Sequence, residues 1–278
     1  MIDAGPLLTL EVHEQLVAAS AAGGGEIHCS LDLKRSSSVV AVGRDAWTAH
    51  GRTFPMMTVC KDRTIYHWNG AEFLPVARYE GALIKLVPTQ WGAPTFEIDG
   101  IKMLPTEKVS PFDDARKKVA LVEPKGKRIL DTCGGLGYFA AHCLEGGAQQ
   151  VVSFEKHPTV VWLRSLNPWS PEHLCKGDQR LQLTQGSVLD HIGTFGSESF
   201  DALLHDPPRF GIAGELYAQT FYDELARVLK RRGRLFHYTG TPNRLTTGRD
   251  VPNEVASRLK RSGFSTQLIG DGVLATKR

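Results

Sequence analysis

Acidic residues and glycines at the ends of two apolar runs are the part of this sequence best suited to chemistry. The first run ends at Asp131 and leads directly into a turn that contains Gly134, Gly135 and Gly137. The next apolar run ends at Glu155, eighteen residues after Gly137. Glycine is needed where backbone takes positive φ or passes close to a ligand, and an acid in this place can accept hydrogen bonds from both hydroxyls of a ribose. The pattern therefore predicts a nucleoside-binding strand, turn and helix.

The glycine turn differs from two common nucleotide-binding loops. It does not follow the GxGxxG spacing of dinucleotide sites, and it lacks the GK[ST] ending of a phosphate loop. A plain strand-ending turn would explain its glycines, but not Glu155. The predicted cofactor site comprises the turn and the two strand ends: Asp131, Thr132, Cys133, Gly134, Gly135, Gly137, Glu155 and Lys156.

A third apolar run, about 75 residues after the turn, ends at Asp206 and is followed by Pro207 and Pro208. Proline fixes φ and removes a hydrogen-bond donor, so the strand has to stop there. Ligands of open parallel sheets bind at the carboxyl ends of the strands. We therefore expect Asp206 at the same edge as Gly135 and Glu155. A strand that ends in Asp-Pro-Pro is common by itself. The spacing of this one from the glycine turn is what makes it a candidate functional motif.

The elements that must position these residues change character along the chain. From about residue 127, apolar runs at 128–131, 151–155, 181–184, 201–206 and 233–238 alternate with helical patterns near 137–145, 158–166 and 215–230. This alternation predicts an α/β fold with a parallel sheet. Residues 262–276 predict a final pair of strands joined by a turn at Gly270-Asp271-Gly272.

The first half has the texture of short strands separated by turns. Runs between about 26 and 104 are rich in β-branched residues, and Asn69-Gly70 predicts a two-residue hairpin. A helix from Leu10 to Ala21 is expected to precede them and to end at a run of glycines. We predict a small, mainly antiparallel domain over residues 1–110 and the α/β domain over residues 111–278.

Composition is that of an ordinary globular protein, with 278 residues, 41% hydrophobic and 23% charged, and a net charge of +3. Basic residues gather at 230–234 and 258–261, which we interpret as solvated helix ends. Five scattered cysteines form no C-x-x-C pair, which argues against a zinc site and favours a reducing, cytoplasmic location. No apolar run is long enough to span a membrane, and the N-terminus has no pattern of a secretory signal.

The glycine turn, of the form D-x-x-G-G-x-G, resembles the first motif of class I methyltransferases, whose cofactor is S-adenosylmethionine. The sequence Asp206-Pro207-Pro208-Arg209 resembles their catalytic motif for amino nitrogens or base carbons. The resemblance implies a Rossmann-like sheet with an antiparallel last strand pair. In that family the residue after a glycine such as Gly186 contacts the adenine, which implies roles for Ser187 and Val188. Many members have an acid at that position; Asp190, three residues on, is either a substitute or a helix N-cap.

From about Phe96 onward the chain is also similar to spermidine synthases, which share a small β domain before the nucleoside fold. Those enzymes usually have Asp-Ser or Asp-Ala where this chain has Asp206-Pro207. The whole combination resembles a spermidine synthase-like group of predicted methyltransferases named mainly from archaea. For that group we expect the first half of the chain to act as a lid or as a surface that selects the acceptor.

The resemblance implies catalytic roles for Asp206, Pro207 and Arg209. Asp206 would orient the acceptor and take its proton, and the Pro207 carbonyl would accept a second bond from an amine. Arg209 stands where related enzymes stack an aromatic residue on a base, which favours an anionic acceptor, although Phe210 offers another stacking face. Tyr217, Tyr222, His237 and Tyr238 are expected near the same edge, with His237 either a general base or a structural residue.

Three functions remain open from the sequence. The first is a methyltransferase acting on a small molecule or an RNA nucleotide, without a metal ion or a membrane partner. The second is an aminopropyltransferase that uses decarboxylated cofactor and a polyamine, with acids drawn from Asp99, Asp113, Asp114 and Asp206. The third is a noncatalytic nucleoside-binding module. The oligomeric state, a homo-oligomer included, is open.

Overall fold

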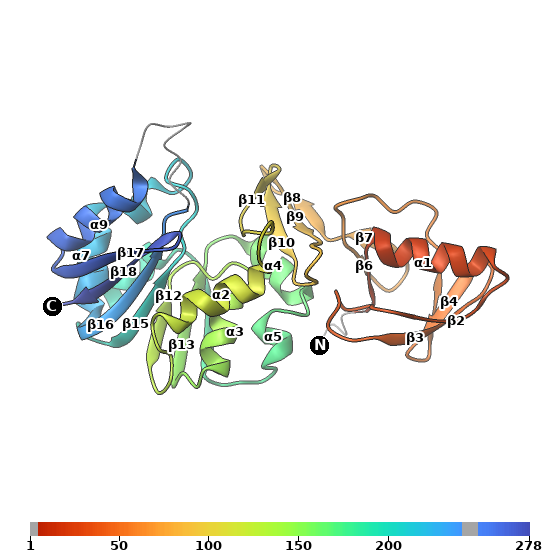
Figure 1. Ribbon diagram of the computed structural model, residues 1–278, viewed down its shortest axis with the longest axis horizontal. Coiled ribbons are helices and arrows are strands. Elements are labelled where there is room, and N and C mark those ends of the chain that lie inside the picture. Colours follow the sequence, from red (N-terminus) through yellow and green to blue (C-terminus); the bar gives the residue numbers. More distant parts are fainter. Residues whose placement is uncertain (1–4, 241–249) are drawn as a thin grey trace. The chain divides into compact units, whose positions relative to one another are not determined.

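The structure, a computed structural model, describes residues 5–240 and 250–278. The chain divides into two compact units (Figure 1). The first unit contains the residues up to Phe112 together with Trp162–His173, and the second contains Asp113–Val161 and Leu174–Arg278. Each unit is described by itself.

The second unit is built on a seven-stranded sheet in the order β14-β13-β12-β15-β16-β18-β17. The first five strands in that order are parallel, whereas β18 runs antiparallel to both β16 and β17. The predicted Rossmann-like sheet with an antiparallel last pair is confirmed. The strand bounds are β12 Arg128–Asp131, β13 Gln150–Glu155, β14 Leu181–Gln185, β15 Phe200–His205, β16 Leu229–Tyr238, β17 Phe264–Ile269 and β18 Gly272–Lys277.

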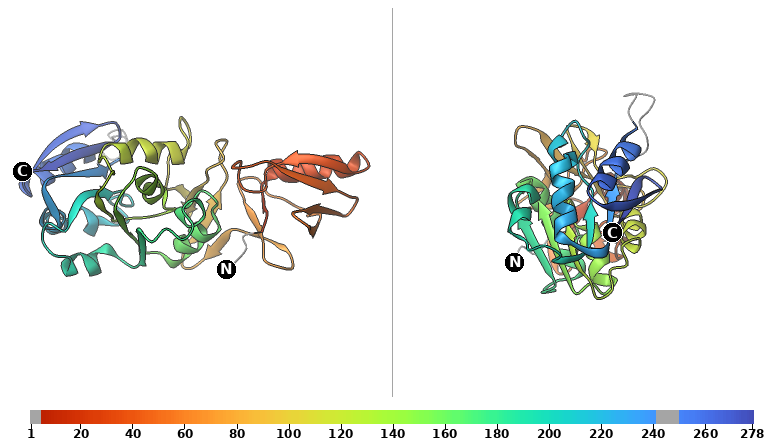
Figure 2. Two further views of the ribbon diagram at one scale, coloured as in Figure 1. Left: turned by 90° about the horizontal axis from the view of Figure 1, so that it is seen from below. Right: turned by 90° about the vertical axis from the view of Figure 1, so that its left-hand side faces the viewer.

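Helices flank this sheet and bury their apolar sides. α7 and α9 pack against one another and against the β16–β18 region (Figure 2). α9 begins after Asp250, whose side chain accepts from the Asn253 N–H, and it buries Val255 and Leu259. The helix bounds along the chain are α2 Pro111–Ala120, α3 Tyr138–Glu145, α4 Pro158–Leu166, α5 Pro171–Leu174, α6 Val188–His191, η1 Ile192–Thr194, η2 Gly214–Tyr217, α7 Gln219–Val228 and α9 Val251–Arg261. Of these, the part of α4 from Trp162 and most of α5 belong to the first unit.

The basic cluster at 230–234 was expected at a helix end, and that interpretation is wrong. α7 ends at Val228 and β16 begins at Leu229, so the cluster forms the first part of a strand. The β15–β16 pairing is irregular at this point, and Arg232 has a positive φ of 63°. Lys230 pairs with Asp201 of β15 at 2.7 Å, so these charges belong to the solvated start of a strand. The cluster at 258–261 does lie in the last turn of α9.

The first unit contains three small antiparallel sheets, β2-β3-β4-β5, β1-β6-β7 and β11-β10-β9-β8. Helix α1, Leu10–Ala21, has the predicted bounds and begins after the N-cap Thr9. The core gathers around Trp47, which stacks on Phe54 at 4.6 Å. The strand bounds are β1 Leu7–Leu8, β2 Gly25–Cys29, β3 Ser38–Val42, β4 Ala46–Ala49, β5 Arg52–Pro55, β6 Tyr66–Trp68, β7 Phe73–Pro75, β8 Ala77–Tyr79, β9 Leu83–Val87, β10 Thr95–Ile98 and β11 Ile101–Lys102.

The hairpin at Asn69-Gly70 exists, but its loop is longer than the two residues expected. β6 ends at Trp68 and β7 begins at Phe73. The Asn69 side-chain oxygen accepts from the N–H groups of Ala71 and Glu72. An asparagine that bonds the backbone ahead of it in this way favours a wider turn.

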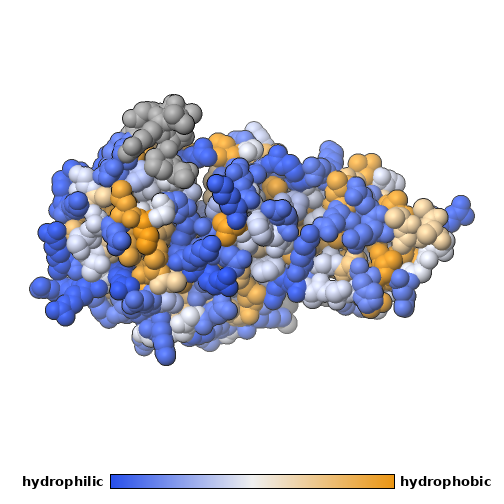
Figure 3. All heavy atoms as spheres, viewed as in Figure 1, coloured by the Kyte–Doolittle hydropathy of each residue, from blue (hydrophilic) through white to orange (hydrophobic). Residues whose placement is uncertain are grey.

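Residues 162–173 pack with the first unit although they are distant from it in sequence. The Arg78 guanidinium lies 3.9 Å from the centre of the Trp162 ring, and the Trp169 indole donates to the Leu33 carbonyl at 3.0 Å. The buried Arg164 donates to both carboxylate oxygens of Glu172. Within residues 5–240 and 250–278, no helix is long and apolar enough to cross a membrane. Polar side chains cover most of the face of the second unit drawn in Figure 3, with a narrow apolar strip between them.

Candidate active site

The glycine turn at the end of β12 is tied directly to the neighbouring strand. The Gly134 N–H donates to the Phe154 carbonyl at 2.6 Å, and the Gly137 N–H donates to the Gly134 carbonyl at 2.7 Å. Gly135 and Gly137 have φ values of 50° and 81°. This left-handed conformation favours glycine. The sequence forms a tight turn whose backbone leads into the N-terminus of α3.

Glu155, the last residue of β13, holds the same turn. One carboxylate oxygen accepts from the Gly135 N–H at 2.8 Å, and the other accepts from the His157 N–H at 2.8 Å. The predicted glycine turn and the predicted ribose-binding acid are therefore in contact. A carboxylate oxygen accepts more than one hydrogen bond, so these contacts are compatible with two ribose hydroxyls.

Asp131 and Thr132 lie inside the sheet. Asp131 is fully buried and accepts from the Ser153 hydroxyl at 2.8 Å. The Thr132 hydroxyl lies 2.6 Å from Nδ1 of His205, which binds β12 to β15. Through these bonds to the neighbouring strands, the two residues fix the point at which the glycine turn begins. Cys133 is partly buried, and its burial raises the pKa of the thiol.

Three further predicted cofactor residues lie after β14, and one lies after β13. The Gly186 N–H donates to the Glu155 carbonyl at 2.9 Å, so the ends of β13 and β14 are held together. Ser187 is the N-cap of α6, and its hydroxyl accepts from the Leu189 N–H. Val188 is buried and Lys156 is exposed. The N-cap alternative for Asp190 is therefore wrong: that residue is exposed in the first turn of α6, because Ser187 already caps the helix.

Asp206 follows β15 directly, at the same carboxyl edge as Glu155 and the glycine turn. Burial raises the pKa of its carboxyl group to about 7. Lys118 lowers that pKa, whereas the charges of Asp114 and Asp271 raise it further. A carboxylate with a pKa near neutrality is suited to accepting and releasing a proton at physiological pH.

Lys118 is a residue that the sequence interpretation missed. It lies on α2, is only 5% exposed, and forms ion pairs with Asp114 at 2.6 Å and with Asp271 at 3.1 Å. Its ammonium group also lies 4.2 Å from the centre of the Tyr238 ring. Burial acts to lower the pKa of Lys118, but attraction to Asp206, Asp114 and Asp271 outweighs it and raises the pKa. The i,i+4 spacing of Asp114 and Lys118 was the signal available in the sequence.

The residues after Asp206 form a fixed turn. Pro207 is buried, and the Tyr217 hydroxyl donates to the Pro208 carbonyl at 3.1 Å. The Arg209 residue is exposed, and its carbonyl accepts from the Ile212 N–H at 2.7 Å. Phe210 packs edge-on to Tyr217, with ring centres 5.4 Å apart. The roles predicted for Pro207 and Arg209 stay predictions.

His237 is a structural residue in this arrangement. It is fully buried, its Nδ1 lies 2.7 Å from the Tyr238 carbonyl, and its Nε2 lies 3.0 Å from the Tyr222 hydroxyl. Burial lowers the pKa of His237 to about 4, so the ring is neutral and both nitrogens are engaged. This geometry fits the structural alternative better than a general base.

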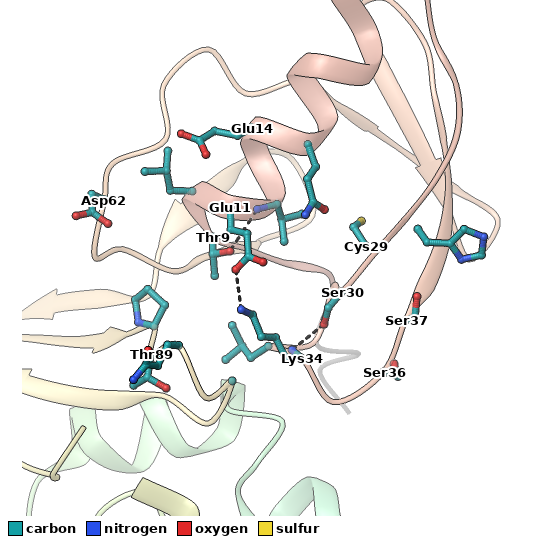
Figure 4. Close-up of a pocket in the computed structure, with 18 of the residues that line it drawn as sticks. Thr9, Glu11, Glu14, Cys29, Ser30, Lys34, Ser36, Ser37, Asp62 and Thr89 are labelled. Atoms are coloured by element: carbon teal, nitrogen blue, oxygen red, sulfur yellow. Dashed lines mark hydrogen bonds and ion pairs between the residues drawn. The ribbon is translucent and has the colours of Figure 1, made fainter. Parts of the chain in front are cut away.

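An open cavity of about 660 Å³ lies elsewhere, in the first unit (Figure 4). Glu11 of α1 reaches Lys34 across it, with an ion pair of 2.8 Å. The Ser30 hydroxyl accepts from the Lys34 N–H at 2.7 Å. None of the residues predicted for the cofactor or for catalysis lines this cavity. We place the candidate site at the sheet edge of the second unit, because the groups able to do chemistry gather there.

Known proteins resemble this chain in sequence and in fold. No family model matches the chain. Uncharacterized protein MJ1233 of Methanocaldococcus jannaschii is 44% identical over 251 residues, which are 86% of this chain and 84% of that protein. Polyamine aminopropyltransferase 2 of Streptomyces coelicolor is 30% identical over 143 residues, 48% of this chain and 26% of that protein.

Solved structures show the same fold. Spermidine synthase from Thermotoga maritima matches with a TM-score of 0.56 and 17% identity, covering 73% of this chain and 72% of that one. A Streptococcus mutans protein assigned as a S-adenosylmethionine-dependent methyltransferase matches with a TM-score of 0.50 and 14% identity, covering 76% and 57%. By its likeness to MJ1233 over most of both chains, this protein belongs to the MJ1233 family, and it shares the fold of spermidine synthase.

Proposed function

We propose that this protein transfers a methyl group from S-adenosylmethionine to a nucleophile of a small molecule or an RNA nucleotide. The coarser activity, transfer of a methyl or an aminopropyl group from a cofactor of this type, is supported by both kinds of relative. The observation that carries the proposal is the position of Asp206, which follows β15 at the carboxyl edge of the sheet and has a carboxyl pKa of about 7.

The residues at the edge fit the cofactor that we propose. Glu155 presents a carboxylate beside the glycine turn, where it would bind the ribose hydroxyls. The turn from Thr132 to Gly137 would hold the methionine end, and Ser187 with Val188 would contact the adenine. When bound, S-adenosylmethionine supplies an electrophilic methyl group on a positively charged sulfur.

Asp206 would act on the acceptor. Its carboxylate accepts a hydrogen bond from an N–H or O–H of the acceptor and aims the lone pair at the methyl carbon. When the acceptor atom takes up the methyl group, its proton would pass to the Asp206 carboxylate. Holding both reactants in line is worth several kcal/mol of the barrier, and a base with a pKa near 7 is matched to this proton transfer.

Aminopropyl transfer is the second candidate. It is favoured by the partial identity with Polyamine aminopropyltransferase 2 and by three carboxylates, those of Asp114, Asp206 and Asp271, which would suit a polyamine. Two observations weigh against it. Lys118 already lies between two of these carboxylates, and Arg209 next to Pro208 would repel a polycation.

Competition between the two cofactors tests the proposal. We expect S-adenosylmethionine to raise the melting temperature of the protein more than its decarboxylated form does at equal concentration. A ligand at one hundred times its dissociation constant stabilises the folded state by about 2.7 kcal/mol, which a thermal shift assay detects. Titration calorimetry then gives both affinities. Tighter binding of the decarboxylated form would replace methyl transfer by aminopropyl transfer.

A further inference from the structure

The surroundings of Lys118 are those of a binding site for an ammonium ion. Carboxylates of Asp114 and Asp271 contact its Nζ at 2.6 and 3.1 Å, and the Tyr238 ring lies 4.2 Å away. Paired carboxylates with an aromatic face are the groups that bind a cationic amine most strongly. Here the bound ammonium belongs to the protein itself, and only 5% of Lys118 is exposed.

Three separate elements bring these groups together beside the catalytic carboxylate. Asp114 and Lys118 lie on α2, Asp271 lies in the turn between β17 and β18, and Tyr238 ends β16. Asp206 directly follows His205, which pairs with His237 of β16, and Tyr238 directly follows His237, so Asp206 and the Tyr238 that Lys118 contacts end neighbouring strands. The charge of Asp206 also raises the pKa of Lys118. The arrangement therefore depends on the tertiary fold of the second unit and is built at its active edge.

Charge explains what the ammonium does there. Asp114, Asp206 and Asp271 can carry three negative charges, and Lys118 supplies one positive charge. Each ionised carboxylate disfavours ionisation of the others. Without the ammonium, the free-energy cost of ionising the half-buried Asp206 would rise. A base that cannot ionise near neutral pH cannot accept a proton.

We propose that Lys118 is a positioning residue: a tethered ammonium group, held by Asp114 and Asp271, that stabilises the ionised form of the nearby Asp206 and occupies the place in which an amine of a polyamine would otherwise bind. This inference rests on the proposed function, because it gives Asp206 the role of base. It also narrows the substrate class to acceptors that do not need an ammonium subsite beside Asp206.

Replacement of the Lys118 side chain by a free amine tests whether this place binds an ammonium group. Lys118→Ala lacks the last three carbons and the ammonium of lysine, which n-propylammonium supplies. We expect n-propylammonium chloride to raise the melting temperature of K118A above that in sodium chloride of equal ionic strength. Neutral n-propanol should not do so, and the unaltered protein should not respond to either. Equal responses to n-propylammonium and n-propanol would overturn the ammonium site.

NMR titration of the Asp206 carboxyl group tests whether Lys118 stabilises its ionised form, and it needs no acceptor. Relative to the unaltered protein, Lys118→Met should raise the midpoint of the Asp206 titration by about 1 to 3 pH units, and Lys118→Arg should leave it close to its original value. Lys117→Met, at the exposed neighbour, is the matched control and should leave it unchanged. The fit must also include the charged or titratable groups of the surrounding elements that interact with Asp206. They are Lys118, Asp114, Asp271, Asp131, Cys133, Tyr217 and Tyr238.

The unaltered protein provides a measurement that does not depend on any variant folding. The Lys118 side-chain resonance should shift with the same midpoint as the Asp206 carboxyl. A Lys118 resonance that does not respond to Asp206 titration would overturn the proposal. Failure of the proposed function is separable: calorimetry showing that the unaltered protein binds neither cofactor would remove methyl transfer but leave the amine and NMR results standing.

Discussion

Asp206 is influenced by opposing effects at the scale of a single residue. Burial and the carboxylates of Asp114 and Asp271 favour the protonated form, whereas Lys118 favours the ionised form. Together these effects raise the pKa of the Asp206 carboxyl group from its usual value of 3.8 to about 7. Such a perturbed carboxyl group at a ligand edge is typical of a functional site.

This raised pKa predicts a pH-dependent stability effect. The folded state holds the Asp206 proton more tightly than the unfolded state, so its contribution is fully present below pH 3.8 and is lost as the pH rises through about 7. Asp206→Asn stays neutral throughout. We therefore expect the variant to gain stability over the unaltered protein between pH 5 and pH 8, by about 2 to 4 kcal/mol. Urea unfolding of both proteins at pH 5 and at pH 8 measures this difference in the free energy of unfolding.

The control for this experiment is Asp113→Asn, on the exposed side of α2, whose partner is Arg116. Its effect on stability should not change over the same range. A pH-independent effect of Asp206→Asn would show that the carboxyl group is not perturbed. The same variant should keep its affinity for S-adenosylmethionine, because the role that we propose for Asp206 is to act on the acceptor.

Glu155 is the residue whose loss should weaken cofactor binding most directly. Glu155→Gln keeps the size of the side chain but loses charge-assisted bonds to the ribose, and it weakens the contact with the Gly135 N–H. We expect affinity for S-adenosylmethionine to fall by about 1 to 3 kcal/mol, measured by titration calorimetry. Glu198→Gln, which affects a surface pair with Lys277, is the control. Unchanged affinity in a folded Glu155 variant would remove Glu155 from the site.

At the scale of elements, the antiparallel pairing of β16 with β18 fixes the end of β16 next to the candidate site. Gly272 pairs with Tyr238, and a Cβ at position 272 would lie 2.6 Å from both the His237 carbonyl and the edge of the Phe236 ring. We expect Gly272→Ala to destabilise the protein by about 1 to 3 kcal/mol through overpacking. Chemical denaturation measures the loss.

Gly193→Ala is the matched control for that substitution, because a Cβ there would have nothing within 4 Å. Its effect should stay within about 0.5 kcal/mol. Equal stability of the two variants would mean that β16 and β18 can separate at this position without cost.

At the scale of the whole molecule, the first unit includes residues from both halves of the chain. A chain that begins at Thr106 keeps every residue of the candidate cofactor site, so we expect it to bind S-adenosylmethionine. It also leaves Trp162 and Trp169 without the Arg78 and Leu33 contacts. We therefore expect stronger binding of a hydrophobic dye than in the full chain.

Replacing Trp162 and Trp169 by Gln in the truncated chain should reduce that dye binding and serves as its control. Loss of cofactor binding in a truncated chain that is folded by circular dichroism would show that the first unit contributes to the cofactor site. The role of the first half in selecting the acceptor stays a prediction.

Much of the second unit followed from local signals in the sequence. Strand and helix patterns, with glycine and proline at their ends, predicted the sheet, its antiparallel last pair and the meeting of Glu155 with the glycine turn. α1 was predicted with its observed bounds. These features depend on the backbone preferences of residues close together in the chain, and the carboxyl ends of parallel strands share an edge once the sheet forms.

Tertiary packing decided the rest. Lys118 meets Asp271 across 153 positions of sequence, and neither residue carries a local mark of that pairing. Residues 162–173 join the first unit because Trp162 and Trp169 find their partners there. The basic run at 230–234 lies in a strand whose pairing with β15 resumes at Arg234, opposite Ala202, after an irregular stretch. The pairing of buried charged residues depends on how elements distant in the sequence pack together. The periodicity of residues along the chain does not contain that information.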